Sequence, residues 1–300
     1  MIYVGPHVSI AGGVQTAPHR AVDLGATALG LFTKNQRQWA SKPLLPDEIT
    51  AFRGGLEEAG ISAAHAVIHG SYLINIGNPD PQKRRKSLDG LLDECNRAEQ
   101  LGLSLVNFHP GSGMGDLDDD ETLSLIAEGC RSILDRTSSA VLVLEATAGQ
   151  GSHVGHRFAH LGQIIERTGS PRRMGVCIDS CHIFAAGYDV RSAQAYARTM
   201  DEFEREVGLD RLVAIHLNDA KVALGSRRDR HELIGEGAIG LAGLANFVRD
   251  SRLAHLPFVL ETPVPDRWKQ EIELLRRLAE TDEPAQDSVP DQDRRREGRA

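Results

Sequence analysis

Six side chains that can bind metal ions or transfer protons stand at corresponding places along this sequence, each directly after a short apolar run: His69, His109, Glu145, Asp179, His216 and Glu261. Imidazole and carboxylate groups without thiolates are ligands that suit zinc, manganese or iron. A single histidine or carboxylate in such a place more often makes a structural hydrogen bond or caps the next helix. Six of them after six successive runs form a pattern, and that pattern predicts a metal site.

Three further groups of the same kind follow shortly after two of these positions: His182, Asp229 and His231. The resulting set of five histidines and four carboxylates is too large for one tetrahedral ion, so it predicts two or three metals. Several dications held in this way can cradle a phosphoryl group and promote phosphodiester hydrolysis. The net charge of -8 by itself argues against a nucleic-acid-binding protein. Three dications among four ligand carboxylates would nevertheless leave the site at about +2, which attracts phosphate.

The apolar runs alternate with segments of helical periodicity, which is the sequence pattern of a parallel α/β fold. We expect strands at 3–4, 28–32, 66–68, 103–108, 141–144, 175–178, 212–215 and 258–260, and helices at 47–59, 83–101, 120–137, 158–168, 193–207 and 241–251. A doubly wound open sheet would show the same periodicity, but no G-x-G-x-x-G follows the first run, and the count of eight favours a (β/α)8 TIM barrel. In a barrel the C-terminal ends of the strands converge on one mouth, so residues distant in sequence become neighbours there.

We expect one TIM-barrel catalytic domain over 1–279, because a chain of 300 residues with ordinary globular composition suits a single barrel. The remainder, 280–300, is polar and contains two prolines, so a disordered tail is expected. The start of the chain has no basic and then apolar leader, and no apolar run reaches about 18 residues, so the sequence predicts a cytoplasmic protein without membrane attachment. Four cysteines without a C-x-x-C pair do not predict a disulfide framework, and we expect Cys177 and Cys181 to be buried.

Several longer stretches resemble the endonuclease IV family of abasic-site endonucleases: FTKNQRQW (32–39), SYLIN (71–75), NFHPGS (107–112), GVCIDSCHIFAAGYD (175–189), HLNDAK (216–221), GSRRDRHELIGEGAIG (225–240) and LET (260–262). The resemblance runs from Tyr3 to about Leu278. It implies a zinc-dependent endonuclease of base excision repair whose partner is double-stranded DNA. Such an enzyme cuts 5′ to abasic sites, leaves a 3′-hydroxyl and a 5′-deoxyribose phosphate, and trims blocked 3′ ends. A monomer is expected.

The resemblance also implies roles for individual residues. Three Zn²⁺ ions per chain are expected, with Mn²⁺ as an alternative at one or more sites. His69 and His109 would bind the first ion, Asp179, His216 and Glu261 the second, and His182, Asp229 and His231 the third, with Glu145 bridging the first two. Glu145 and Glu261 are the expected catalytic carboxylates. Arg37 and Tyr72 resemble residues that enter the DNA helix at the lesion.

Two positions depart from the family's usual pattern. Many relatives have Asn where this chain has Ala146, and an acidic residue is common where it has Gly70. Side chains at both positions can form hydrogen bonds that orient the metal ligands. The two departures therefore affect the expected orientation of the ligands more than their identity. His7 ends the first strand, where it can either face the mouth or serve the structure.

Two other functions are compatible with parts of the pattern. Some sugar isomerases and epimerases use histidine and carboxylate metal sites in a barrel, and fold analogy does not exclude them. The number of ligands, the segment Asp229–His231 and the KNQRQ loop favour a nuclease. A non-enzymatic DNA-binding role is weaker, because the sequence has no basic stripe and no helix-turn-helix pattern.

Overall fold

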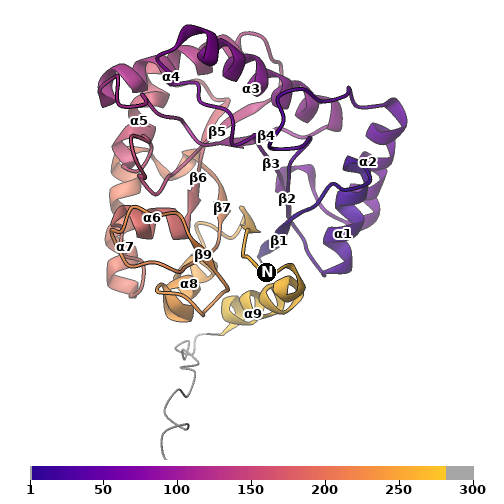
Figure 1. Ribbon diagram of the computed structural model, residues 1–300. Helices are drawn as coiled ribbons and strands as arrows, with labels where there is room; N and C mark the ends of the chain where they lie inside the picture. The colour runs from indigo at the N-terminus through magenta and orange to yellow at the C-terminus, as the bar shows by residue number, and fades with distance from the viewer. Residues whose placement is uncertain (1, 282–300) are drawn as a thin grey trace, which may run out of the picture.

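The computed structural model describes residues 2–281 and forms a closed barrel of eight parallel strands surrounded by helices (Figure 1). The barrel strands are β1 (Tyr3–Val8), β2 (Leu29–Leu31), β3 (Ala66–His69), β4 (Leu105–Phe108), β5 (Val141–Glu145), β6 (Met174–Asp179), β7 (Leu212–His216) and β10 (Pro257–Leu260). Neighbouring strands in the barrel follow chain order, and β1 closes it by pairing with β10. The predicted TIM barrel is therefore confirmed.

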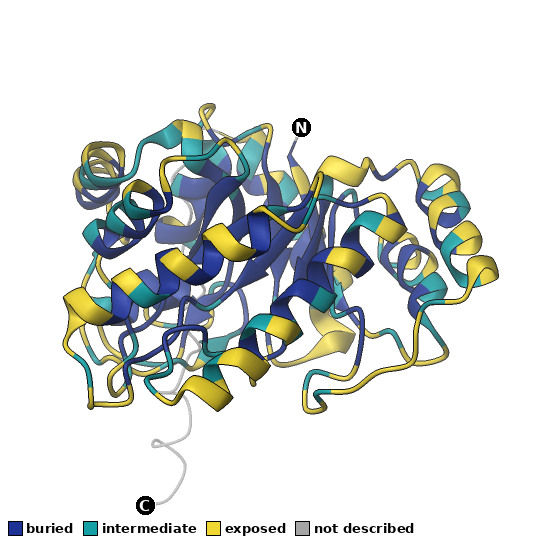
Figure 2. Ribbon diagram, turned by 90° about the horizontal axis from the view of Figure 1, so that it is seen from above, coloured by how far each residue is buried: buried dark blue, intermediate teal, exposed yellow. Residues whose placement is uncertain are grey.

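The helices that surround the barrel are α1 (Ala17–Asp23), α2 (Pro46–Ala59), α3 (Pro81–Leu101), α4 (Asp119–Leu134), α5 (Phe158–Thr168), α7 (Ala193–Glu206), α8 (Gly240–Arg249) and α9 (Trp268–Glu280). Their inner faces are buried and their outer faces are exposed (Figure 2). All six predicted helices are present with shifts of a few residues at most. α1 and α9 were not predicted. The predicted tail, 280–300, begins inside α9, and its residues 282–300 lie outside the described residues.

Helix boundaries follow from local capping. The carboxylate of Asp80 accepts hydrogen bonds from the backbone N–H groups of Gln82 and Lys83, and Pro81 occupies the first position of α3. Gly102 ends the same helix in the left-handed conformation, at φ 78°. These caps fix where α3 begins and ends, and thus place it relative to β4, the strand that follows it.

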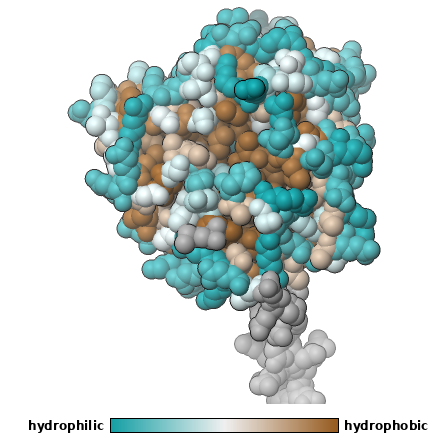
Figure 3. All heavy atoms as spheres, turned by 180° about the vertical axis from the view of Figure 1, so that it is seen from behind, coloured by the Kyte–Doolittle hydropathy of each residue, from teal (hydrophilic) through white to brown (hydrophobic). Residues whose placement is uncertain are grey.

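The core has two layers. A large apolar layer fills the space between the strands and the helices, and a small inner layer fills the barrel itself with Val67, Leu105, Val143, Cys177, Ala214 and Val259. Seen from behind, hydrophobic atoms gather toward the middle of the molecule and hydrophilic atoms occupy its rim (Figure 3). Within residues 2–281 no helix is long and apolar enough to cross a bilayer.

The inner layer determines what lies at the mouth. Alternate residues of a strand point to the same side, so the residue two positions after each inner apolar residue also faces the barrel axis. Those residues are His69, Asn107, Glu145, Asp179, His216 and Glu261. The polar set at the mouth is thus the next layer of the barrel interior.

Candidate metal centre

Glu145, at the end of β5, is the centre of the polar layer and is fully buried, with 0% of its surface exposed. Its Oε1 lies 3.2 Å from Nδ1 of both His216 and His182. Its Oε2 lies 3.1 Å from His69 Nε2 and 3.4 Å from His109 Nε2. One carboxylate therefore contacts four of the five predicted histidine ligands.

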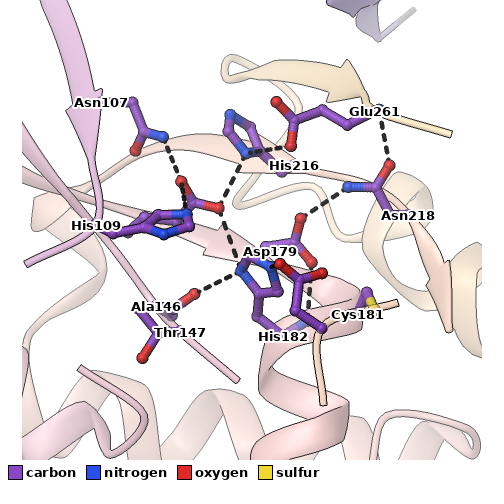
Figure 4. Close-up of polar contacts among 12 residues, drawn as sticks. Asn107, His109, Ala146, Thr147, Asp179, Cys181, His182, His216, Asn218 and Glu261 are labelled. Atoms are coloured by element: carbon purple, nitrogen blue, oxygen red, sulfur yellow. Dashed lines mark hydrogen bonds and ion pairs between the residues drawn. The ribbon is translucent and has the colours of Figure 1, made fainter. Parts of the chain in front are cut away.

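Asp179 ends β6 and also begins the short helix α6 (Ser180–Ala186), which the sequence pattern did not predict. Its Oδ1 accepts a hydrogen bond from the backbone N–H of His182 at 2.8 Å, so this N-cap fixes the first turn that carries His182. The His182 ring then points back to the mouth, with Nδ1 3.0 Å from the carbonyl oxygen of Ala146 (Figure 4). His182 Nε2 faces Asp229 Oδ2 at 3.2 Å.

Asp229 and His231 come from a hairpin over the mouth, formed by β8 (Asp219–Ala220) and β9 (His231–Glu232). His231 Nε2 lies 3.3 Å from Asp229 Oδ1 and 3.7 Å from Asp179 Oδ2. The buried carboxylate of Asp219 holds the return from this hairpin by accepting backbone hydrogen bonds from Gly235, Gly237 and Ile239. Asp229 and His231 therefore come from the hairpin after β7 and not from the end of a barrel strand.

Glu261 directly follows β10 and completes the cluster. Its Oε2 lies 3.4 Å from His216 Nδ1, and its backbone N–H donates to Asn218 Oδ1 at 2.8 Å (Figure 4). The amide of Asn218 also donates to Asp179 Oδ2 at 2.7 Å, so one side chain links two predicted ligands. All nine predicted ligands therefore lie in one cluster at the mouth.

Mutual electrostatics shift the pKa values of the cluster in opposite directions. Burial tends to raise the pKa of Glu145, but the charges of His216 and His109 hold it well below its usual range. Burial likewise tends to lower the pKa of His231, but Asp179 and Asp229 raise it to about 9. The carboxylates and imidazoles of the cluster thus stabilise each other's charged forms. The carboxylates therefore favour positive charge in this place, which is also what a metal ion would supply.

The cluster fits metal ions by three observations. Within residues 2–281, none of the ion pairs of Glu145, Asp179, Asp229 or Glu261 involves Lys or Arg, although buried carboxylates need a compensating charge. The Nε2 atoms of His182 and His231 are buried, and within the same residues each lies near an oxygen of Asp229 without forming a hydrogen bond. Their other ring nitrogens are held by the carbonyl oxygens of Ala146 and Glu261, the usual arrangement behind a metal-binding histidine.

The donor atoms group as separate metal ions would require. Glu145, Asp179, His216 and Glu261 form one set, and His182, Asp229 and His231 form another, each with ligand atoms within 4.8 Å of one another. His69 and His109 each form a set with Glu145, but with His216 and His182 as the respective third members. Cys181, buried as predicted, reaches a set with Asp179 and His231, which the sequence did not indicate.

At Gly70 and Ala146, the two positions that depart from the family's usual pattern, backbone carbonyl oxygens contact the histidine ligands. His69 Nδ1 lies 2.7 Å from the carbonyl oxygen of Gly70, and His182 Nδ1 contacts that of Ala146. A carbonyl oxygen is present whatever the side chain. Ring orientation at both histidines therefore does not depend on the residue types at 70 and 146.

Sequence reasoning missed two residues of the cluster, Asn107 and Asn218, and left open whether His7 faces the mouth or serves the structure. Asn107 Nδ2 donates to Glu145 Oε2 at 2.5 Å, and His7 Nδ1 lies 2.7 Å from Glu261 Oε1. Asn107 lies within what the sequence presents as an apolar run, and only the period of two along the strand would have singled it out.

The two predicted DNA-contacting residues lie on loops beside the cluster. Arg37 is exposed in the loop after β2, and Tyr72 is 58% exposed in the loop after β3. The Tyr72 ring centroid lies 5.2 Å from that of His69 and 6.0 Å from that of His109. A cavity of about 640 Å³ extends from Glu261 and His231 to Lys34, Asn35, Gln36 and Tyr72. The cluster and the two loops thus share one open space.

Residues 18–278 match the family described as the xylose isomerase-like TIM barrel. The chain is 50% identical over 278 residues to the probable endonuclease 4 of Campylobacter concisus, covering 93% of this chain and 98% of the relative. It is 49% identical over 280 residues to the probable endonuclease 4 of Chlorobium phaeobacteroides, covering 93% and 99%.

One solved structure agrees with these relatives, and a second shares the fold. The endonuclease IV of Thermus thermophilus superposes with a TM-score of 0.82 at 38% identity, covering 93% of this chain and 99% of that one. A D-tagatose 3-epimerase-like protein has a TM-score of 0.72 at 15% identity, covering 93% and 97%. At that identity the second likeness shows a shared fold alone.

Proposed function

The chain belongs to the endonuclease IV family, and on that premise we propose that it is a metal-dependent deoxyribonuclease that cuts double-stranded DNA 5′ to abasic sites in base excision repair. The products would be a 3′-hydroxyl and a 5′-deoxyribose phosphate, and blocked 3′ ends would be trimmed by the same site. The observation that carries the proposal is a shared space: His231 and Glu261 of the nine-ligand cluster line one cavity together with Tyr72 and with residues 34–36 of the loop that carries the exposed Arg37.

We propose that three Zn²⁺ ions occupy the cluster, with Mn²⁺ as an alternative at one or more sites. His69 and His109 would hold one ion, Asp179, His216 and Glu261 a second, and His182, Asp229 and His231 a third, with Glu145 shared by the first two. Ions in such a site polarise a phosphoryl group and make water a better nucleophile at neutral pH. The grouping of donor atoms supports this assignment at the second and third sets.

The two proposed catalytic carboxylates have different surroundings. Both oxygens of Glu145 contact histidines, and the side chain is fully buried. Its proposed role is to bridge the first and second ions and to fix the distance between them. Glu261 instead borders the cavity and lies between His7 and His216. It can accept a hydrogen bond from a water molecule in the cavity and orient that water toward a phosphorus atom.

Recognition of the lesion is proposed for Arg37 and Tyr72. An abasic sugar turned out of the helix leaves a gap in the base stack, and exposed side chains on loops at the mouth can fill it. Tyr72 is suited to this because an aromatic ring stacks on neighbouring bases. Its position over His69 would place the filled gap directly beside the metal ligands.

The decisive experiment offers the protein a duplex with one abasic site, an undamaged duplex of the same sequence and a panel of ketoses. We expect cleavage of the first alone, with a new 3′ end that a polymerase extends and with loss of cleavage after chelation. A duplex carrying a blocked 3′ end tests the trimming activity. Consumption of a ketose without DNA cleavage would establish a sugar-converting enzyme in place of the nuclease.

A further inference from the structure

Four charged side chains lie together beneath the loop that carries Arg37, outside the metal cluster. Lys34 comes from the start of this loop, and Asp93, Glu94 and Arg97 come from α3. Lys34 is 5% exposed, Glu94 1% and Arg97 4%. Charged residues are rarely buried to this extent unless they are paired. We call residues 33–42 the recognition loop, and these four side chains the anchor cluster.

The anchor cluster holds the first residues of the recognition loop. Lys34 Nζ lies 2.5 Å from Asp93 Oδ2 and 3.4 Å from Glu94 Oε1. The hydroxyl of Thr33 donates to Glu94 Oε2 at 2.6 Å. Burial raises the pKa of Glu94, and the charge of Lys34 and the Thr33 hydrogen bond act in the opposite direction.

The same cluster also holds the last residues of the loop. Arg97 pairs with Asp93 Oδ2 at 3.2 Å and donates to the carbonyl oxygen of Thr33 at 3.4 Å. It further donates to Ser41 Oγ at 2.6 Å and to the carbonyl oxygen of Lys42. One buried arginine therefore joins both ends of the loop to α3, while Arg37 stays exposed between them.

Helix α3 also contacts Trp39 of the recognition loop and the loop that carries Tyr72. The Trp39 ring packs over Gly90, where an added Cβ would come within 3.3 Å of it, and Lys86 Nζ lies 4.7 Å from the ring centroid. The Tyr72 loop is joined too, because Ser71 Oγ donates to the carbonyl oxygen of Gln36 at 2.7 Å and Ser87 on α3 accepts from Asn75 N–H at 3.1 Å.

Stability alone does not account for the anchor cluster. Two cations and two anions sum to zero charge, but removing charges from water is costly, and apolar residues of similar volume are often as good or better for stability. What a charged cluster adds is a unique geometry, because each hydrogen bond fixes a direction as well as a distance. A loop fixed in advance binds with a smaller loss of conformational entropy.

We propose that Lys34 and Glu94 are positioning residues for DNA recognition, which together with Asp93 and Arg97 hold the recognition loop so that Arg37 stands at the mouth before DNA arrives. The proposal rests on the proposed function of Arg37. It assigns no chemistry to the anchor cluster, so the cluster should influence the binding of abasic DNA and not the cleavage step.

The first test is Glu94→Gln, which keeps the shape and the Thr33 hydrogen bond but removes one charge. We expect the Kd for an abasic duplex to rise by about tenfold, kcat at saturating DNA to stay within about twofold, and bound metal to be unchanged. Amide hydrogen exchange without DNA should accelerate in residues 33–42 and not at the strand ends. The matched control is the exposed pair on the same helix, Arg85→Met with Asp89→Asn, which should alter none of these measurements.

A double variant separates positioning from stability. Lys34→Met with Glu94→Gln restores neutrality, so its melting temperature should recover toward that of the parent. Its Kd should stay raised, because the start of the loop has lost both ion pairs that Lys34 makes with α3. A double variant with both parental stability and parental Kd would overturn the proposal, as would parallel loss of metal in either variant.

Arg37→Ala in the parent background distinguishes failure of this inference from failure of the proposed function. If Arg37→Ala leaves the Kd unchanged, the assumed role of Arg37 is wrong. If Arg37→Ala weakens binding and the anchor variants neither weaken binding nor accelerate exchange in residues 33–42, the anchor cluster has no positioning role.

Discussion

Glu261 and His7 meet where the barrel closes, with Oε1 of the carboxylate 2.7 Å from Nδ1 of the imidazole. Glu261 directly follows the last strand, β10, and His7 lies in the first, β1; these two strands pair at Pro6 and Leu260. A carboxylate that follows three apolar strand residues needs a partner, and a lysine or arginine would indicate a structural ion pair. Here the partners in residues 2–281 are His7 and His216, and both face the cavity or the metal cluster.

Replacing Glu261 with Gln should therefore reduce catalysis more than stability. The variant keeps the shape of the side chain and should fold and bind abasic DNA. Single-turnover cleavage should fall by at least about a hundredfold, as when other electrostatic catalytic groups are removed. The control is Glu271→Gln, a buried carboxylate that binds the Thr262 hydroxyl and the backbone N–H of Ile234. It should lower the melting temperature while the folded fraction cleaves normally. Near-parental cleavage by Glu261→Gln would remove this residue from the catalytic site.

Protein purified without chelator should contain close to three zinc ions per chain. Elemental analysis of His231→Gln should give close to two, because in the proposed assignment His231 is a ligand of the third ion and of neither of the others. Chelation should abolish cleavage, and added Zn²⁺ should restore it. Active protein with a single metal per chain would contradict the trinuclear assignment.

Arg37→Ala and Tyr72→Ala should each weaken binding and cleavage of abasic DNA without loss of metal. Loss of an aromatic stacking contact typically costs about 1–3 kcal/mol, so the Kd should rise by roughly 5- to 150-fold for Tyr72→Ala. Arg205→Ala, an exposed arginine on α7, is the matched control and should bind normally. If the variant that combines both changes cuts as well as the parent at subsaturating DNA, these residues do not recognise the lesion.

Glu99 on α3 should make stability depend on pH. Burial raises the pKa of Glu99, but hydrogen bonds from the backbone N–H groups of Ser139, Ala140 and Ser138 outweigh it and lower the pKa to about 2. A carboxylate whose pKa is lowered in the folded state stabilises the fold at any pH above its ordinary pKa. That stabilisation is lost as the pH falls from the ordinary pKa toward about 2. The difference in free energy of unfolding between parent and Glu99→Gln, measured in urea, should therefore shrink as pH falls from about 6 to about 3. The control is Glu57→Gln, at an exposed position of α2, whose free energy of unfolding should differ little from that of the parent at any pH in this range. If the difference for Glu99→Gln stays constant with pH, the lowered pKa of Glu99 does not contribute to stability.

The sequence by itself determined the order of the barrel strands, six of the helices between them and most of the candidate metal cluster. Apolar runs and helical periodicity are local properties, so α5 was predicted with both of its observed bounds, Phe158 and Thr168. The ionisable residue that ends each run is likewise visible along the chain. Once eight parallel strands are assumed to close, chain order alone brings His69 and Glu261 to one mouth.

The tertiary structure decided which side chains touch. Asn107 joins the cluster because it is the next inward position after Leu105, and that follows from the phase of the strand relative to the barrel axis. His7 meets Glu261 only because β1 pairs with β10, although the two residues are 254 positions apart in sequence. Lys34 finds Glu94 across the space between a loop and a helix. Such contacts depend on strand register and side-chain direction between elements, which no local pattern in the sequence records.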